Sequence, residues 1–304
     1  METIPWRGVL VATTLPLHPS DLGVDLDAYS DHVRWLADSG CDGVVPNGSL
    51  GEYQVLTAAE RTAVVRAAVD AAPDGFAVIP GVAAYGTDEA QRWTEQAAEA
   101  GCPAVMLLPP TVYRADEAAV LAHYRAVAKV GLPIVAYNNP IDTRVDLTPP
   151  LLQQLYDEGL IVAVKEFSGD PRRAYEINEL APGLDLLAGA DDVTLELVVA
   201  GAVGWIGGFP NAIPTQCVQL YRAALAGDLA TALPLYRLLH PLLRWDSRTE
   251  FVQAIKLSMD VAGRPGGPCR PPRQPLTPPV ATAIREATLR ALAVADQPLP
   301  LEDE

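Results

Sequence analysis

Short apolar runs alternate along the chain with longer segments in which apolar residues recur at helical spacing. The runs contain few polar interruptions, which is typical of parallel strands buried on both faces. Eight of them occur, at residues 8–12, 43–46, 77–80, 104–108, 134–137, 161–165, 184–188 and 204–206. The intervening segments predict amphipathic helices, for example at 27–39, 58–72, 88–100 and 117–130. Successive strand–helix units of this number predict an α/β fold, the (β/α)8 TIM barrel.

Residues at the expected helix ends support this alternation. Glycine accepts the left-handed conformation that often ends a helix, and it stands shortly before strands at Gly40, Gly101, Gly131, Gly159 and Gly201. Helices should begin at Thr57, Thr87 and Thr148, and Glu60 follows Thr57 at the spacing of a capping box. An open doubly wound sheet is the main alternative. Residues 9–16, however, lack the glycine-rich phosphate loop that usually follows its first strand.

The pattern changes after the eighth strand. Residues 211–262 predict helices alone, residues 265–279 are rich in proline, and residues 280–295 predict one more amphipathic helix. We therefore expect a barrel core at 1–210, which contains the catalytic residues. We expect 211–304 to supply the last barrel helix and a C-terminal helical extension of the same domain.

Composition narrows the classes of function. The 304 residues carry a formal net charge of −16, and 49% of them are hydrophobic, so a large core can be buried. A strongly acidic surface repels nucleic acid and anionic membranes, and we expect neither as a partner. The sequence contains no apolar run long enough to span a bilayer, and we recognise no secretory leader at its start.

Neither the cysteines nor the histidines form a motif. The four cysteines are widely spaced without a CxxC pair, which favours reduced thiols and a cytoplasmic protein. The four histidines show no metal-ligand spacing. We therefore expect no metal and no cofactor, and a small molecule as the partner.

Two chemically useful side chains end neighbouring strands, where the active sites of such barrels lie. The sixth run ends in Lys165 and the fifth in Tyr137. Burial lowers the pKa of a lysine amine, which can then attack a 2-oxo acid and form a Schiff base. Because consecutive strands are neighbours, the Tyr137 phenol can relay protons for that amine. The plainer interpretation is a lysine that reaches solvent from its strand and a tyrosine in a turn beside Pro140.

A short loop after the second run contains Gly48, Ser49, Leu50 and Gly51. Two glycines around a hydroxyl residue leave backbone amides exposed before a helix. Such a loop can bind a carboxylate through its amides and the Ser49 hydroxyl. An ordinary βα turn is the alternative, because short Gly-Ser segments are common.

Other polar and aromatic residues have simpler interpretations. Asp191 opens a helix and is expected to cap it. Trp205 either borders the pocket or packs in the core, and Gly208 lets the backbone approach a ligand. Arg144 and Lys256 are expected to be ordinary basic residues.

Three motifs then stand in a distinctive order: GSLGE at 48–52, YNNP at 137–140 and VKE at 164–166. Through them the chain resembles the dihydrodipicolinate synthase / N-acetylneuraminate lyase family of class I aldolases over nearly its whole length. The resemblance implies that Lys165 forms the imine and that Tyr137 relays protons together with Ser49, which also binds the substrate carboxylate. It further implies a substrate-binding role for Gly48, Leu50, Gly51, Asn139 and Ile206. The family also implies a homo-oligomer, a dimer or a homotetramer.

The sequence departs from the family pattern at three places. Dihydrodipicolinate synthases usually carry a second hydroxyl residue where Leu50 stands. They carry a further tyrosine where Val112 stands, although Tyr113 is adjacent. They carry an arginine where Asp142 stands, and Arg144 follows two residues later. These departures point away from the lysine-pathway activity.

A subgroup matches additional segments, among them LPP at 108–110, LLR at 242–244 and FVQ at 251–253. These segments look like those of Δ1-pyrroline-4-hydroxy-2-carboxylate deaminases, which implies release of ammonia and 2,5-dioxopentanoate. A dihydrodipicolinate synthase-like or sugar-acid lyase acting on pyruvate is the second hypothesis, and pyruvate release from a sugar acid would favour it. A catalytically silent barrel with a binding role is the third, and joint retention of Lys165, Tyr137 and Ser49 argues against it.

Overall fold

The computed structural model describes residues 4–111 and 114–296. Its eight strands form one parallel sheet in the order β3-β2-β1-β8-β7-β6-β5-β4. The sheet closes because Met106 N donates to Pro80 O at 2.9 Å and Val82 N donates to Met106 O at 3.0 Å. The strands are β1 (Gly8–Ala12), β2 (Gly43–Val45), β3 (Ala77–Val78), β4 (Val105–Leu107), β5 (Ile134–Asn138), β6 (Ala163–Glu166), β7 (Asp185–Ala188) and β8 (Gly204–Gly207). The predicted (β/α)8 barrel is confirmed.

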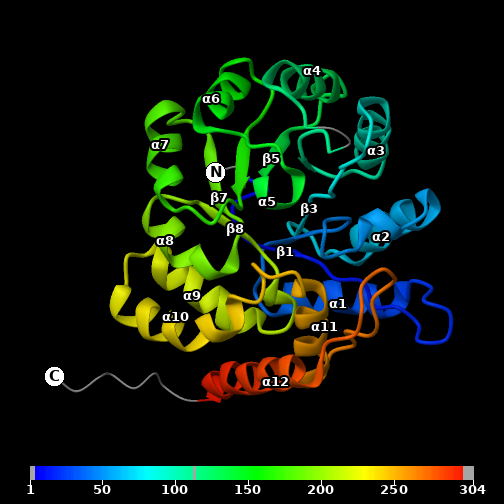
Figure 1. Cartoon of the computed structure of the whole chain (residues 1–304), viewed down its shortest axis with the longest axis vertical. Coiled ribbons are helices and arrows are strands. Elements are labelled where there is room, and N and C mark those ends of the chain that lie inside the picture. Colours follow the sequence, from blue (N-terminus) through cyan, green and yellow to red (C-terminus); the bar gives the residue numbers. More distant parts are fainter. Residues whose placement is uncertain (1–3, 112–113, 297–304) are drawn as a thin grey trace.

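Helices surround the sheet and follow the strands in turn (Figure 1). The helices of the barrel are α1 (Leu26–Asp38), α2 (Ala58–Ala71), α3 (Thr87–Glu99), α4 (Glu117–Ala128), α5 (Pro140–Thr143), α6 (Pro149–Asp157), α7 (Arg172–Leu180), α8 (Thr194–Val199) and α9 (Pro214–Leu225). Three further helices follow, α10 (Leu229–Leu243), α11 (Phe251–Val261) and α12 (Pro278–Leu292), and these pack on one another beside α9. Figure 1 shows them in yellow to red along one side of the barrel.

Helix starts follow the predictions in part. The capping box of α2 is confirmed, because Thr57 Oγ1 accepts from Glu60 N at 3.3 Å and Glu60 Oε2 accepts from Thr57 N at 2.8 Å. Thr148 stands at the N-cap of α6 without a side-chain capping bond. The predicted helix start at Thr87 is confirmed, because α3 begins there and Gly86 is its N-cap residue. The last helix begins at Pro278 rather than at 280, since proline is tolerated in a first helical turn.

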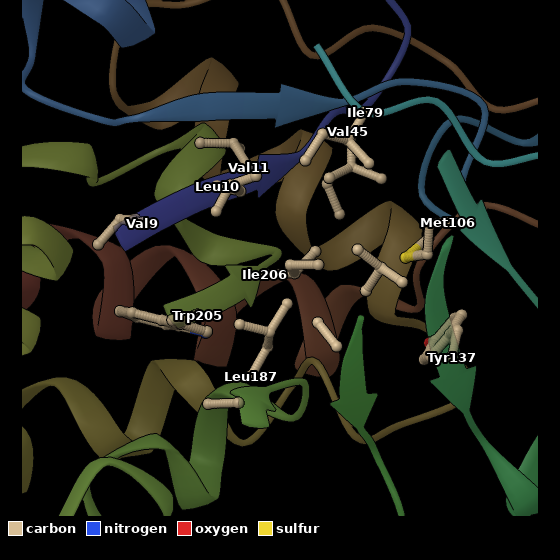
Figure 2. Packing of buried hydrophobic residues seen from close by; sticks show 14 of the residues in the cluster. Val9, Leu10, Val11, Val45, Ile79, Met106, Tyr137, Leu187, Trp205 and Ile206 are labelled. Atoms are coloured by element: carbon tan, nitrogen blue, oxygen red, sulfur yellow. The ribbon is translucent and has the colours of Figure 1, made fainter. Parts of the chain in front are cut away.

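Apolar side chains from the strands fill the barrel (Figure 2). Val9, Leu10 and Ile206 are fully buried there, as is Trp205, so Trp205 packs in the core. Tyr137 and Met106 stand together at the opposite side of the labelled group from Trp205 in Figure 2. These two side chains belong to the part of the barrel interior that opens into the candidate site.

The segment between α11 and α12 returns to the barrel. The Arg270 guanidinium donates to the carbonyl oxygens of Leu22 and Val55 and forms an ion pair with Glu60. The C-terminal extension is therefore fastened to the loops after β1 and β2. The polar segment 297–304, which the sequence predicts to fray, lies outside the described residues. In the described part of the chain, the helices are too short or too polar to cross a membrane.

Candidate active site

Lys165 and Tyr137 occupy paired positions on adjacent strands. In the register of β5 and β6, Tyr137 lies opposite Lys165, and both side chains are only 5% exposed. The Lys165 Nζ atom lies 4.5 Å from the centre of the Tyr137 ring and 5.7 Å from that of Phe167. The two residues that the sequence predicts to work together are therefore in contact.

The Lys165 amine is buried without an ion-pair partner among the described residues. Burial lowers the pKa of Lys165 to about 8, although the negative charges of Asp246 and Asp191 oppose this shift. At a pKa of about 8, roughly one amine in ten is neutral at pH 7, against about one in three thousand at the ordinary value. A substantial fraction of Lys165 is therefore available as a nucleophile near neutral pH.

The Tyr137 phenol is suited to donate and recover a proton. Its hydroxyl oxygen accepts from Asn139 Nδ2 at 3.2 Å. Burial raises the pKa of Tyr137 well above its ordinary value. The phenol therefore remains protonated at neutral pH, and its proton can point toward a ligand beside Lys165.

The residues next to this pair hold the two strands in register. Asn138 Nδ2 donates to Glu166 Oε2 at 2.9 Å, and Leu147 N donates to Asn138 Oδ1 at 2.9 Å. Glu166 Oε1 accepts from Ser168 N at 2.6 Å. Because side chains alternate along a strand, this network faces away from Lys165 and Tyr137 and fixes where those residues stand.

The loop after β2 is held in an unusual shape. Asn47 and Glu52 adopt the left-handed conformation, with φ values of 56° and 51°. Asn47 Nδ2 donates to Arg61 O at 3.0 Å, while Glu52 accepts from Lys256 Nζ at 2.9 Å and from Arg270 N at 2.9 Å. These bonds offset the backbone strain, which is of the order of 1–3 kcal/mol for each left-handed residue.

Inside that loop the backbone amides of residues 48–51 donate no hydrogen bond to the described residues. They are therefore available to a carboxylate, as is the Ser49 hydroxyl. An added Cβ at Gly51 would meet backbone atoms of Asn47 and Thr13 at 3.3 Å. A side chain there would make the neighbouring backbone shift by a few tenths of an ångström, so glycine suits this tightly packed loop.

A cavity of about 540 Å³ joins these elements. Its wall includes Gly48, Ser49, Leu50, Tyr137, Asn139 and Lys165, so the structure brings most of the predicted site residues together. Among the described residues that line the cavity, Gly51 and Ile206 do not appear. Ile206 is instead fully buried in the barrel core, and its substrate-binding role stays a prediction.

The sequence analysis did not predict that two buried carboxylates, Asp191 and Asp246, influence Lys165. Asp191 does not cap the short helix that it opens, which corrects that expectation. Its carboxylate accepts from Trp205 Nε1 at 2.9 Å and from Phe209 N at 2.7 Å, and so holds the turn after β8. Asp246 lines the cavity and is 5% exposed. Asp246 lies between two helices and away from any strand end, so no pattern in the sequence indicated that it would line the cavity.

The basic residues around the cavity were predicted in part, because Arg144 is the ordinary exposed residue that the sequence predicts. Asp142 lines the cavity, whereas Arg144 is exposed and lies outside it. Arg248 and Arg273 line the cavity instead, both from the C-terminal part of the chain. Val112 and Tyr113, which the sequence comparison with the family singled out, lie outside the described residues.

Lys256 is not the ordinary basic residue that its sequence context suggests. It is 1% exposed, and its Nζ donates to Glu52 Oε1 at 2.9 Å and to Pro268 O at 2.6 Å. It therefore joins α11 to the loop after β2. A lysine within an apolar helical pattern carries no sign of a partner that lies so far away in sequence.

The buried histidines have structural roles. His32 Nε2 bonds to Asn211 Oδ1 at 3.0 Å, and His123 Nδ1 bonds to Thr87 Oγ1 at 3.0 Å. Burial lowers the pKa of each imidazole to about 4, so both remain neutral. Within residues 4–111 and 114–296, His, Cys, Asp and Glu side chains do not gather into a group that could hold a metal ion.

Comparisons with known proteins agree with this geometry. The model of the dihydrodipicolinate synthetase family matches residues 5–291. The 4-hydroxy-tetrahydrodipicolinate synthase of Acidothermus cellulolyticus is 33% identical over 287 residues, covering 94% of this chain and 92% of the relative. That of Methanospirillum hungatei is 30% identical over 288 residues, covering 94% and 99%. The crystal structure of dihydrodipicolinate synthase from Aquifex aeolicus has a TM-score of 0.89 at 28% identity and covers 98% of this chain and 100% of that one.

Proposed function

The chain belongs to the dihydrodipicolinate synthetase family, and on that premise we propose that Lys165 forms a Schiff base with a pyruvate-type 2-oxo acid. It is an enzyme of the lyase or aldolase type. In the proposed reaction, a carbon–carbon bond is made or cleaved next to the imine carbon. The observation on which this rests is a buried amine without an ion-pair partner, 4.5 Å from the ring of Tyr137 in a closed barrel.

The chemistry needs only groups that the chain supplies. The neutral Lys165 amine attacks the carbonyl carbon, water leaves, and the protonated imine withdraws electrons from the neighbouring carbon. Loss of a proton from that carbon gives an enamine, which attacks an aldehyde; the reverse sequence cleaves the bond. Tyr137 transfers the protons, directly or through Ser49.

The loop after β2 can hold a 2-oxo acid with its carbonyl carbon near Lys165. Gly48, Ser49 and Leu50 of this loop line the cavity that also contains Lys165, and their amides donate no hydrogen bond to the described residues. A 2-oxo acid has its carboxylate one bond away from the reacting carbonyl. Binding of that carboxylate by the Ser49 hydroxyl and the Gly48 amide would therefore hold the carbonyl carbon near the amine.

Borohydride trapping tests the proposal. The protein is incubated with pyruvate and reduced, and the modified peptide is identified by mass spectrometry. Because the chain contains only three lysines, Lys129, Lys165 and Lys256, the assignment is simple. We expect the adduct on Lys165 alone and none in Lys165→Arg. The matched control, Lys129→Arg, changes an exposed lysine and should trap as the unmodified chain does; an adduct that persists in Lys165→Arg contradicts the proposal.

The deaminase reaction is a second candidate, and the acidic groups in the cavity favour it. Asp142 stands where an arginine would bind the carboxylate of a second substrate, and Asp246 lies in the same cavity. Carboxyl groups suit a substrate that carries a hydroxyl and releases an amine. In this reaction Lys165 attacks the ring imine of 4-hydroxy-pyrroline-2-carboxylate, the ring opens, water is lost, and hydrolysis yields ammonia and 2,5-dioxopentanoate.

Product analysis separates the two candidates. Steady release of ammonia from the hydroxy-pyrroline, without pyruvate formation from sugar acids, supports the deaminase. Pyruvate release from a 2-keto-3-deoxy sugar acid supports the carbon–carbon lyase. A chain that traps neither pyruvate nor the hydroxy-pyrroline at Lys165 is a binding protein, and the catalytic proposal is then wrong.

A further inference from the structure

Asp246 has a free carboxylate oxygen at the wall of the cavity. It lies in the turn between α10 and α11, and its Oδ2 accepts from Asp191 N at 3.3 Å. Its Oδ1 accepts no hydrogen bond from the described residues. An added Cβ at Gly208 would lie 2.7 Å from Asp246 Oδ1 and 3.0 Å from Leu50 Cδ1. Because Gly208 and Leu50 also line the cavity, the absent side chain at Gly208 leaves room for this oxygen.

The neighbouring carboxylate does not share this freedom. Both oxygens of Asp191 accept hydrogen bonds, from Trp205 Nε1 and from the amides of Gly208 and Phe209. Asp191 therefore holds the protein together, and Asp246 is the member of the pair that can act on a ligand. A buried carboxylate with an unsatisfied oxygen is costly unless it has a function or a partner.

Within the described residues, Lys165 is the other buried charged side chain of the cavity wall with a polar atom that makes no hydrogen bond. It is 95% hidden from solvent, as Asp246 is, and it makes no hydrogen bond there. The charge of Asp246 is the largest electrostatic influence on the pKa of Lys165. In turn, burial and the Asp191 charge raise the pKa of Asp246 well above its usual range, and Lys165 opposes this. The two groups therefore influence each other's charge within the cavity that both line.

We propose that Asp246 is a second catalytic acid–base residue, which takes a proton from the Lys165 ammonium and returns it to the hydroxyl that leaves as the Schiff base forms. This inference rests on the proposed function, because it needs an imine at Lys165. It assigns a step to a residue outside the Tyr137 and Ser49 relay. Lys165 and Asp246 line the same cavity but form no ion pair with each other, so the proposed transfer runs through a water molecule in that cavity.

The step balances in atoms and charge. The ammonium of Lys165 gives one proton to the Asp246 carboxylate, which leaves a neutral amine and a carboxylic acid. The amine adds to the carbonyl carbon, and a proton moves from nitrogen to oxygen, giving a carbinolamine. The acid then protonates the carbinolamine hydroxyl, which departs as water while the nitrogen lone pair forms the C=N bond. The products are the protonated imine, water and the regenerated carboxylate, which faces the new positive charge.

A role through the electric field alone predicts something different. The charges that face Asp246 are Lys165 from β6, Asp191 and Asp192 from the turn after β7, and Arg248 beside it in the cavity. Removal of the Asp246 charge lowers the pKa of Lys165 further, because that charge favours the ammonium. If Asp246 acted only in this way, its loss would make more neutral amine and faster imine formation at low pH.

The test measures the rate of imine formation with pyruvate, by borohydride quenching at successive times, from about pH 6 to about pH 10. For Asp246→Asn we expect the midpoint of the profile to move to lower pH and the plateau rate at high pH to fall about 100-fold. The control Asp31→Asn removes the same charge from a side chain that is 70% exposed, and should match the unmodified chain.

A second variant guards against misfolding and against a structural role. Asp246→Ala creates space at the cavity wall, and added formate should raise its rate of imine formation, whereas formamide should not. A purely structural residue predicts no such rescue. An unchanged plateau rate in Asp246→Asn, or a rate in Asp246→Ala that formate does not raise, overturns the inference while Lys165 trapping stands. If the unmodified chain traps no pyruvate at Lys165, the proposed function and the inference fall together.

Discussion

Two buried lysines, Lys165 and Lys256, show how the same side chain serves opposite purposes in this molecule. They are 5% and 1% exposed. Lys256 donates to the Glu52 carboxylate and to a carbonyl oxygen, so its charge has partners on two sides. Lys165 faces two aromatic rings and a cavity, without a hydrogen bond to a described residue. Burial alone therefore does not identify a reactive lysine.

The partners of each amine explain the difference. A buried charge that is hydrogen-bonded to a carboxylate persists and joins segments of the fold. A buried charge that lacks partners is unfavourable, and the amine spends part of its time neutral. Strand β6 places Lys165 in the second situation, because Ala163 and Val164 before it are apolar and the end of the strand opens into the cavity. Helix α11 gives Lys256 its hydrogen-bonded environment, because this helix packs against the loop that contains Glu52.

The largest difference is expected from Lys165→Met. Turnover and pyruvate trapping should be abolished, because the nucleophile is gone. The free energy of unfolding should rise by up to about 3 kcal/mol at pH 7, since the folded pKa of about 8 lies below the unfolded value of about 10.5. That gain should vanish as the pH rises above about 10.5, where the lysine is neutral in both states. Urea unfolding at several pH values measures it, and a destabilised variant at pH 7 would contradict the comparison.

Lys256→Met is expected to lower the free energy of unfolding, whereas Lys165→Met is expected to raise it. Removal of Lys256 leaves the buried Glu52 carboxylate with only the Arg270 amide and the more distant Arg273 guanidinium as partners, and we expect a loss of about 3 kcal/mol in the free energy of unfolding. Glu52→Gln in the same background should recover part of it, since both charges are then absent. Thermal and urea unfolding of the two single variants and the double variant measure the coupling. Equal stability of Lys256→Met and the unmodified chain would remove the distinction between the two lysines.

The sequence predicts one half of this comparison well. The strand bearing Lys165 is a local pattern of apolar residues, and parallel neighbours follow each other in a barrel, so Lys165 and Tyr137 could be paired in advance. Their predicted strands end one residue early, at 137 and 165 rather than at 138 and 166. Both predicted strands are one residue too short at the same end, so the predicted pairing of Tyr137 with Lys165 is unaffected.

The other half depends on contacts that no local pattern records. Lys256 meets Glu52 across 204 positions of sequence, and Asp246 meets Asp191 across 55. Each of these residues stands in a segment where the sequence shows only helical spacing or a turn. The helix α11 places Lys256 under the loop after β2, and the turn before it places Asp246 at the cavity. Only the three-dimensional packing of the extension on the barrel reveals either role.

Tyr137→Phe sharpens the comparison on the reactive side. Loss of the hydroxyl should lower turnover about 100-fold, because one positioned acid–base group is lost. The ring that faces Lys165 remains, so the midpoint of the pH profile for imine trapping should stay near 8. Steady-state rates and trapping rates on the same preparation measure the two effects. An equal loss in trapping and in turnover would remove Tyr137 from proton relay and leave it a packing role.

The smallest effect is expected at the loop that Lys256 supports. Ser49→Ala removes one hydroxyl from the carboxylate site but leaves the amides of residues 48–51, so KM for the 2-oxo acid should rise about tenfold. Ser39→Ala, which removes a hydroxyl at the end of α1, is the matched control and should leave KM unchanged. Lys256→Met should also raise KM, because Glu52 then loses one of the bonds that fix the loop. If Ser49→Ala lowers kcat while KM stays constant, Ser49 acts in proton transfer, and the two lysines influence the substrate through separate groups.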